Sequence, residues 1–198
     1  MRKNDPEGVR ARILDAAAEL FQERGYSASS MQHIFEKANV TCGAFYHHFE
    51  SKKDLGLTVI KERVADAVMG TWIAPVRAAS CVIDGIKQVF KAIAVELDAN
   101  RAVRGCPLNN LTLEMAYADP DFQQLLNEIF ANWQLELERL VKRDVKQGVL
   151  FGPSPKRTAA FIIAVYSGAM AMSKVRQSAD PLRICLTELT TALETRQR

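Results

Sequence analysis

Residues 25–55 read GYSASSMQHIFEKANVTCGAFYHHFESKKDL, and this spacing is typical of two short helices joined by a tight turn. The first helix is expected to end at Ala38, because Asn39 tolerates the positive φ that closes a helix. Thr41 is a suitable N-cap for the second helix, which is expected to reach about His48. The stretch therefore predicts a helix-turn-helix, whose second helix enters the major groove of DNA.

The second helix is predicted to turn an apolar side inward and a polar rim outward. The expected buried pivots are Ile34, Val40, Phe45 and Phe49. If Phe45 points inward, its neighbours Tyr46 and His47 must point elsewhere, because consecutive helical side chains diverge. Gly43 has no side chain, so the backbone there can approach a phosphate closely.

Two kinds of side chain in this stretch are candidates for contacts with DNA. Hydroxyl, imidazole and ammonium groups bind phosphates, which fix the register of the protein on the duplex. The outward side chains of the second helix, together with Gln32, are candidates for reading base edges. The predicted DNA-binding residues are Ser30, Gln32, Thr41, Cys42, Gly43, Ala44, Tyr46, His47 and Lys52, with Lys53 as the alternative to Lys52 and with Arg2 and Lys3 on an N-terminal arm.

The Tyr-His-His sequence at residues 46–48 has two other interpretations. Such a sequence at a helix end is often a half-buried aromatic cluster that serves only packing. Cys42, His47 and His48 have the residue types of a metal site, but helical offsets of five and six residues do not bring ligands together. We therefore expect no metal and no cofactor, and the packing alternative stays open.

The whole segment resembles the N-terminal domain of the TetR family of bacterial transcriptional repressors. The family pattern is similar to G-[YF]-x-x-T-[ST]-x-x-D-I-A-x-x-A-G-V-S-x-G-x-[LI]-Y-x-[HY]-F-x-[SN]-K-[ED]-x-L. This chain matches it at Gly25, Tyr26, Ser30, Ile34, Ala38, Val40, Gly43, Tyr46, His48, Phe49, Ser51, Lys52 and Leu55. It departs at Ser29, His33, Phe35, Asn39, Thr41 and Lys53. Phe35 replaces a small residue, so it bears on how the first two helices pack.

The resemblance implies a homodimer whose two reading helices enter successive major grooves of a palindromic operator, about 34–36 Å apart. It also implies an effector pocket in a larger C-terminal domain, and a helix beginning near Lys52 that tilts when an effector binds. The expected division is a helix-turn-helix domain over residues 1–52 and a ligand-binding and dimerisation domain over residues 53–198.

Apolar periodicity and capping residues predict an all-α fold with about nine helices and no strands. Ser51 opens a helix that is expected to run to about Met69, with Gly70 and Pro75 ending it. Three Asp-Pro or Ser-Pro pairs mark later helix starts. The predicted helices cover about 7–24, 29–38, 41–48, 52–69, 83–99, 107–117, 120–148, 155–176 and 181 to the end.

The last two helices are candidates for the dimer interface. The penultimate helix is rich in alanine, serine and glycine, which allow close helix approach. With the final helix it can form a four-helix bundle across a two-fold axis. The alternative is ordinary packing within one chain.

The effector site is predicted less sharply. Aromatic and methionine side chains of the C-terminal part could line a cavity, although apolar residues at helical spacing usually form core. The candidates are Trp72, Phe90, Met115, Tyr117, Phe130, Trp133, Phe161 and Tyr166. Cys106 lies at a predicted helix start near Arg101 and Arg104, and both features raise thiol reactivity. The stretch RGCPLNNLTLEMA is similar to one in a TetR subgroup that includes electrophile-sensing repressors, so Cys106 is a sensor candidate, with an inert buried thiol as the alternative.

Composition limits the location and the class of the protein. The formal net charge is only +3, which by itself does not indicate nucleic acid. The N-terminus lacks an apolar signal segment and the four cysteines lack metal spacing, so we expect a cytoplasmic protein with reduced thiols. The apolar run over residues 159–172 is too short to span a bilayer, which takes about 20 residues.

Three function classes compete on this evidence. A ligand-responsive repressor accounts for the helix-turn-helix and the large helical remainder. An enzyme is not expected, because all three histidines lie in the predicted reading head and no nucleophile elbow or phosphate loop occurs. A non-specific helical DNA-coating protein would need many phosphate contacts, for which the modest charge is unsuited.

Overall fold

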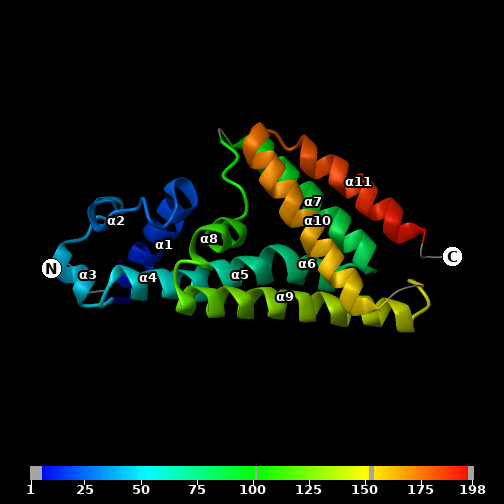
Figure 1. Cartoon of the computed structure of the whole chain (residues 1–198), viewed down its shortest axis with the longest axis horizontal. Coiled ribbons are helices and arrows are strands. Elements are labelled where there is room, and N and C mark those ends of the chain that lie inside the picture. Colours follow the sequence, from blue (N-terminus) through cyan, green and yellow to red (C-terminus); the bar gives the residue numbers. More distant parts are fainter. Residues whose placement is uncertain (1–5, 101, 152–153, 196–198) are drawn as a thin grey trace. The chain divides into compact units, whose positions relative to one another are not determined.

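The structure, a computed structural model, describes residues 6–100, 102–151 and 154–195. These described residues are overwhelmingly helical and contain no strand, which confirms the all-α prediction (Figure 1). If the consecutive helical pieces between residues 52 and 78 are taken together, the described chain has nine helices, as expected.

The contacts between Cα atoms divide the chain into two compact units. Unit 1 comprises residues 1–66 and 107–127, and unit 2 comprises residues 67–106 and 128–198. The chain therefore passes from one unit to the other after residues 66, 106 and 127. The division at residue 52 that the sequence suggested stays a prediction.

Unit 1 is built around the first helix. Its helices are α1 (Pro6–Arg24), α2 (Met31–Ala38), α3 (Cys42–Tyr46), α4 (Lys52–Val59), η1 (Ile60–Val64), α8 (Pro107–Met115) and the first part of α9 (Pro120–Lys146). An apolar stripe of α1, which includes Ile13 and Phe21, is buried, and α2, α3, α4 and α8 all contact this helix. Burial of that stripe is what holds the short helices, since helices of five to eight residues are not stable alone.

The short helices of unit 1 begin and end where the capping residues indicated. Gly25, at φ +89°, closes α1, and Asn39, at φ 52°, closes α2. The Thr41 hydroxyl accepts the amide of Ala44 at 3.1 Å and so caps α3. α3 ends at Tyr46 and not at His48, so this helix is shorter than expected.

The helix that begins at Lys52 is longer than predicted. It continues without a break through α4, η1, α5 (Ala65–Val68), η2 (Met69–Ile73) and α6 (Ala74–Ala78), so the predicted end at Met69 is wrong. Pro75 does not end it, because the π-helical turn η2 lies directly before it, and a helix continues past a proline more easily where the regular i→i−4 bonding is already interrupted. η1 and η2 are π-helical: the amide of Ala74, for example, bonds the carbonyl oxygen of Met69, five residues back.

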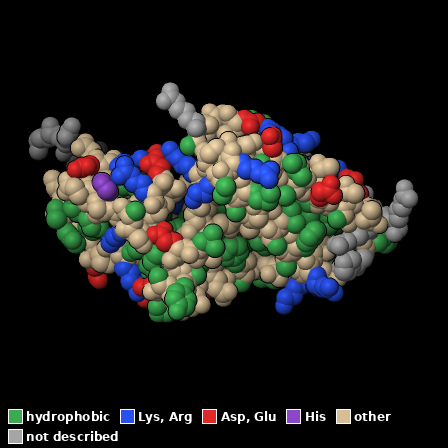
Figure 2. All heavy atoms as spheres, turned by 45° about the horizontal axis from the view of Figure 1, so that its top comes forward, with side chains coloured by type: hydrophobic (Ala, Val, Ile, Leu, Met, Phe, Trp, Pro, Cys, Tyr) green, Lys and Arg blue, Asp and Glu red, His purple; other side chains and the backbone are tan. Residues whose placement is uncertain are grey.

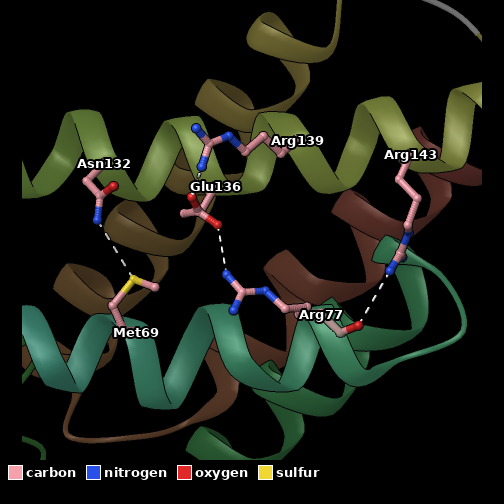
Figure 3. Close-up of polar contacts among 6 residues, drawn as sticks. All are labelled: Met69, Arg77, Asn132, Glu136, Arg139 and Arg143. Atoms are coloured by element: carbon pink, nitrogen blue, oxygen red, sulfur yellow. Dashed lines mark hydrogen bonds and ion pairs between the residues drawn. The ribbon is translucent and has the colours of Figure 1, made fainter.

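Unit 2 contains η2, α6, α7 (Val82–Ala99), most of α9, α10 (Pro155–Arg176) and α11 (Asp180–Glu194). Figure 3 shows the polar contacts that join η2 and α6 to α9. Glu136 of α9 pairs with Arg77 at 2.8 Å and with Arg139, and Arg143 donates to the backbone oxygen of Arg77 at 3.4 Å. Asn132 adds a weak contact from its amide nitrogen to the sulfur of Met69 at 3.9 Å.

A fully buried carboxylate holds the start of α7. Asp144 of α9 is 0% exposed, and its Oδ2 accepts the backbone amide of Val82 at 2.6 Å. Its Oδ1 accepts the Nε of the neighbouring Arg143 at 2.8 Å. This carboxylate thus satisfies one of the orphan amides at the N-terminus of α7 and adds a charge favoured there.

α10 is the one helix of the described residues that is long and apolar enough to cross a membrane by length and composition alone. Nearly half of its apolar window is buried inside the fold, and it contacts α11, which follows it in the chain (Figure 1). We interpret it as a core helix of unit 2, in line with the sequence.

Candidate nucleic-acid interface

The reading helix α3 is oriented by one buried ring. Phe45 is 0% exposed and packs between Phe35, at 5.4 Å between ring centroids, and Phe49, at 5.6 Å. Its neighbour Tyr46 is 56% exposed and His47 is also exposed. A large ring held on one side of such a short helix leaves the opposite side free for other contacts.

The structure brings the predicted contact residues to the surface around α3 and the start of α2. Exposed among them are Ser30, Gln32, Thr41, Cys42, Gly43, Tyr46 and His47, whereas Ala44 and Lys52 are half-buried. Arg2 and Lys3 lie outside the described residues. The described residues contain no cluster of three or more potential metal ligands, although Cys42, His47 and His48 lie close in sequence.

Two departures from the family pattern are accommodated locally. Phe35, where a small residue was expected, stays half-exposed and leans its ring on Phe45 at an interplanar angle of 56°. His33, where an aspartate was expected, completes a capping box with Ser30. The Ser30 hydroxyl accepts the amide of His33 at 3.2 Å, and the imidazole Nδ1 accepts the amide of Ser30 at 3.3 Å.

The basic residues at the start of α4 bond within unit 1. Lys52 donates to the backbone oxygen of Ser27 at 3.4 Å and lies 4.4 Å from the centre of the Tyr26 ring, and burial lowers its pKa. Lys53 pairs with Asp119 at 2.8 Å and Asp121 at 2.6 Å, and these hydrogen bonds raise its pKa to about 12. Lys52 therefore has to release or share an intramolecular partner to bind a phosphate.

The surface charge is mixed. Figure 2 shows Lys and Arg side chains interspersed with Asp and Glu side chains on the face drawn, as the small net charge suggests. Arg10 of α1, for example, forms a bidentate pair with Glu62 of η1, at 2.8 and 2.6 Å. Affinity for DNA therefore has to come from specific placement more than from a broad basic surface.

Unit 2 holds an aromatic cluster that contains four of the predicted effector residues. The ring of Trp72 lies 4.6 Å from that of Tyr166, 5.1 Å from Trp133 and 5.7 Å from Phe90, measured between centroids. The indole N–H group of Trp133 is buried and has no hydrogen-bond partner among the described residues, whereas the equally buried Trp72 side chain interacts with the phenol of Tyr166. Such donors cost stability unless something satisfies them.

Cys106 belongs to the same cluster. Burial raises the pKa of Tyr166 well above its usual value, and the neighbouring Cys106 raises it further. Cys106 is only 7% exposed, which argues for a less accessible thiol than the sequence suggested. Arg101, one of the two arginines thought to activate it, lies outside the described residues.

The other candidates for the effector site are distributed differently. Met115 is buried but belongs to unit 1. Tyr117 is fully exposed and Phe161 is 41% exposed, so neither belongs to the buried aromatic cluster. Tyr117 follows the end of α8, and Phe161 lies on the outer side of α10, where helical periodicity could not distinguish outside from inside.

Comparison with known proteins agrees with the sequence and the fold. Residues 13–58 match the family described as "Bacterial regulatory proteins, tetR family", and residues 82–188 match "Transcriptional regulator LmrA/YxaF-like, C-terminal domain". The HTH-type transcriptional repressor DhaR of Mycobacterium sp. (strain GP1) is 30% identical over 187 residues, which cover 93% of this chain and 92% of that protein. This chain belongs to the TetR family.

Solved TetR-family structures share the fold. A regulator from Chloroflexus aurantiacus J-10-FL superposes with a TM-score of 0.84 at 26% identity, covering 96% of each chain. The regulatory protein TetR from Rhodobacter sphaeroides superposes with a TM-score of 0.83 at 25% identity, and the match covers 92% of this chain and 97% of that chain. The resemblance is thus confirmed, and this TetR-family chain is a transcriptional regulator. Its assignment to the electrophile-sensing subgroup stays a prediction.

One feature of this TetR-family chain was not visible in the sequence. Glu114 of α8 accepts the backbone amides of Tyr26 and Ser27, which lie 88 and 87 residues earlier. No local pattern marks a carboxylate that binds backbone groups so far away. A glutamate two positions after a threonine in a short amphipathic helix looks like an ordinary solvent-facing residue.

A substitution of Lys52 tests its predicted role in phosphate binding. We expect Lys52→Ala to weaken binding to operator and to random DNA and to lower the salt slope by about one unit per subunit on both, because one ammonium contact is lost. The measurement is a salt titration by fluorescence anisotropy, with the exposed Lys61→Ala as control. An unchanged slope would assign the ammonium group to its bonds with Ser27 and Tyr26 instead.

Proposed function

We propose that this TetR-family regulator is a ligand-responsive repressor that binds a palindromic operator as a homodimer and is released when an effector binds unit 2. The observation that carries the proposal is the orientation of α3, which buries Phe45 and exposes Thr41, Tyr46 and His47. Burial in the core does not account for Tyr46 and His47, because both side chains are exposed on a helix that is too short to be stable alone. We further propose that the protein is cytoplasmic and not an enzyme.

The test is footprinting on DNA that flanks the gene of this protein, followed by titration of the protected sequence and of random DNA at the same salt concentration. A repressor of this kind should bind its operator at least about a thousandfold more tightly than random DNA. A non-specific DNA-coating protein would bind both sequences about equally. Equal binding would therefore overturn the proposal.

The proposed dimer uses α10 and α11. Within the single chain, the outer side of α10 exposes apolar and small side chains at helical spacing, and α11 adds one more. These residues are Phe161, Ala164, Gly168, Met172, Val175 and Ile184. Figure 2 shows hydrophobic patches on the surface of the part that carries these helices. An exposed apolar strip of this kind is typical of a helix–helix interface.

Charged substitutions in this strip test the interface. We expect the double variant Val175→Asp with Ile184→Asp to convert the dimer to a monomer, because two carboxylates per subunit would lose their hydration in the interface. Sedimentation velocity at micromolar concentration measures the change. Val145→Asp on α9 is the control, since Val145 is also an exposed valine but lies outside the strip. A double variant that stays dimeric would place the interface elsewhere.

The proposed effector site is the aromatic cluster of unit 2. The unpaired, buried indole N–H group of Trp133 favours a ligand that is largely apolar and carries a hydrogen-bond acceptor. Phe90, Tyr166 and Cys106 complete the proposed site. The alternative function, a thiol-based sensor that acts through Cys106, rests on the contact of that thiol with Tyr166, and the burial of Cys106 makes it the second choice.

A further inference from the structure

We propose that Glu114 is a positioning residue that holds the α1–α2 turn, and through it the DNA-reading head, to helix α8. The proposal rests on the proposed function as an operator-binding repressor and adds one residue through which that function is controlled. All of the contacts that carry it lie within unit 1.

The carboxylate of Glu114 accepts hydrogen bonds from two consecutive backbone amides, one on each oxygen. Glu114 Oε2 accepts the N–H of Tyr26 at 2.8 Å, and Oε1 accepts the N–H of Ser27 at 2.6 Å. Both amides lie between the end of α1 and the start of α2, so no helical ladder satisfies them. Hydrogen bonds to an ionised acceptor are about twice as strong as neutral ones, and these two fix both the position and the direction of the turn.

The turn is shaped to receive this carboxylate. Gly25 has φ +89°, which side chains disfavour, and a Cβ atom there would lie 2.8 Å from Glu114 Oε2. The glycine therefore provides both the conformation that points the two amides in one direction and the space for the carboxylate. A turn that only had to close α1 would not need this space.

Lys52 of α4 contacts the same turn from another side. We call the contacts of Glu114 and Lys52 with Tyr26 and Ser27 the joint. Lys52 donates to the backbone oxygen of Ser27 and lies over the Tyr26 ring, so the same turn is held by a cation from α4 and by an anion from α8. Tyr26 in turn packs edge-on against Phe122 of α9, at 5.0 Å between centroids. Gly56 allows this packing, since a Cβ atom there would lie 2.6 Å from the Tyr26 ring.

The charge of Glu114 is maintained at neutral pH. Burial acts to raise the pKa of Glu114, but the hydrogen bonds from Ser27 and Tyr26 and the charge of Lys52 outweigh it, so the pKa is lowered overall. The titratable groups that face the carboxylate are Lys52 of α4 and the Tyr26 phenol. The joint is therefore intact at neutral pH and is lost only as the pH falls through the lowered pKa.

The joint can transmit a signal because of where α8 begins. α8 begins at Pro107 in unit 1, and the residue before it, Cys106, is the last residue of the segment 67–106 of unit 2. A displacement of that segment would therefore act on α8 through the peptide bond that joins them. The two amides would then lose their acceptor just ahead of Ser30, the N-cap of α2. Because the helix-turn-helix reads DNA only in one orientation, loosening its first turn reduces specific binding most.

The first measurement is hydrogen exchange of the full-length protein by NMR at neutral pH. In the wild type we expect the amides of Tyr26 and Ser27 to be protected. In Glu114→Ala they should exchange at least about tenfold faster, with an intermediate rate in Glu114→Gln, which keeps one oxygen acceptor. The charge-matched control is Asp66→Ala, an exposed carboxylate of unit 1.

The second measurement separates positioning from simple stabilisation. We expect Glu114→Ala to lower the ratio of operator affinity to random-DNA affinity by about tenfold or more, with random-DNA affinity unchanged, whereas Asp66→Ala keeps the ratio. Glu114→Gln, which is nearly isosteric, gives the same test if the alanine variant does not fold. An unchanged ratio in both Glu114 variants would overturn the role of Glu114. A wild type that does not discriminate the two DNAs would instead overturn the proposed function.

Discussion

Tyr46→Ala is expected to lower operator affinity by about a hundredfold while leaving the dimer folded. Tyr46 is 56% exposed on α3, so its ring contributes little to the core, and Phe45 still orients the helix in the variant. A dimer on a palindrome contains this side chain twice, and a loss of about 1.4 kcal/mol in each subunit multiplies to about a hundredfold.

The measurement for Tyr46 is anisotropy with labelled operator, accompanied by circular dichroism and sedimentation to confirm folding and assembly. The chain offers a matched control in Tyr117→Ala, which removes a fully exposed tyrosine of the same unit away from α3. Retention of operator affinity in Tyr46→Ala, or an equal loss in both variants, would contradict the proposed interface.

The largest stability effect is expected for Asp144→Ala, which should lower the free energy of unfolding by about 2–4 kcal/mol. The substitution leaves the amide of Val82 without an acceptor and Arg143 without its partner. This is somewhat less than the cost of about 3–5 kcal/mol that is usual for a broken buried pair, because the Arg143 side chain is 30% exposed and water can partly replace the carboxylate.

Tryptophan fluorescence in a urea titration is the natural measurement for Asp144. The only two tryptophans, Trp72 and Trp133, lie in the aromatic cluster of unit 2, so their emission reports on the unit that contains Asp144. Asp144→Asn should lose less stability than Asp144→Ala, since the amide oxygen of the asparagine can still accept the N–H of Val82. Protein concentration has to be held constant because dimerisation contributes to apparent stability. Asp144→Ala with wild-type stability would show that the carboxylate is dispensable for unit 2.

The helices of unit 1 could be predicted because their signals are local. Ser30, Thr41 and Ser51 each cap a helix through an amide three residues ahead, and Asn39 closes one by its own conformation. The burial of Phe45 with exposure of Tyr46 also followed from helical periodicity. The predicted roles of these residues in DNA binding nevertheless stay predictions, because exposure makes a contact feasible and does not supply the partner.

The errors came from signals whose meaning depends on tertiary context. Gly70 and Pro75 were interpreted as helix ends, but Gly70 lies within the π-helical turn η2 and Pro75 lies just after it, and the helix continues past both. The aromatic residues of unit 2 could be named but not grouped, since Trp72, Phe90, Trp133 and Tyr166 come from four separate helices. The contact of Glu114 with the α1–α2 turn depends on two segments nearly ninety residues apart, which periodicity cannot relate.

The two π-helical turns have a consequence for how this helix tolerates changes in length. A turn bonded to the fifth residue back contains one residue more than an ordinary turn, so deletion of one residue within η1 or η2 can restore regular α-helical bonding. Elsewhere between Lys52 and Ala78 the same deletion would rotate every following side chain by about 100°. A deletion of one residue in this helix is therefore least disruptive at these two turns.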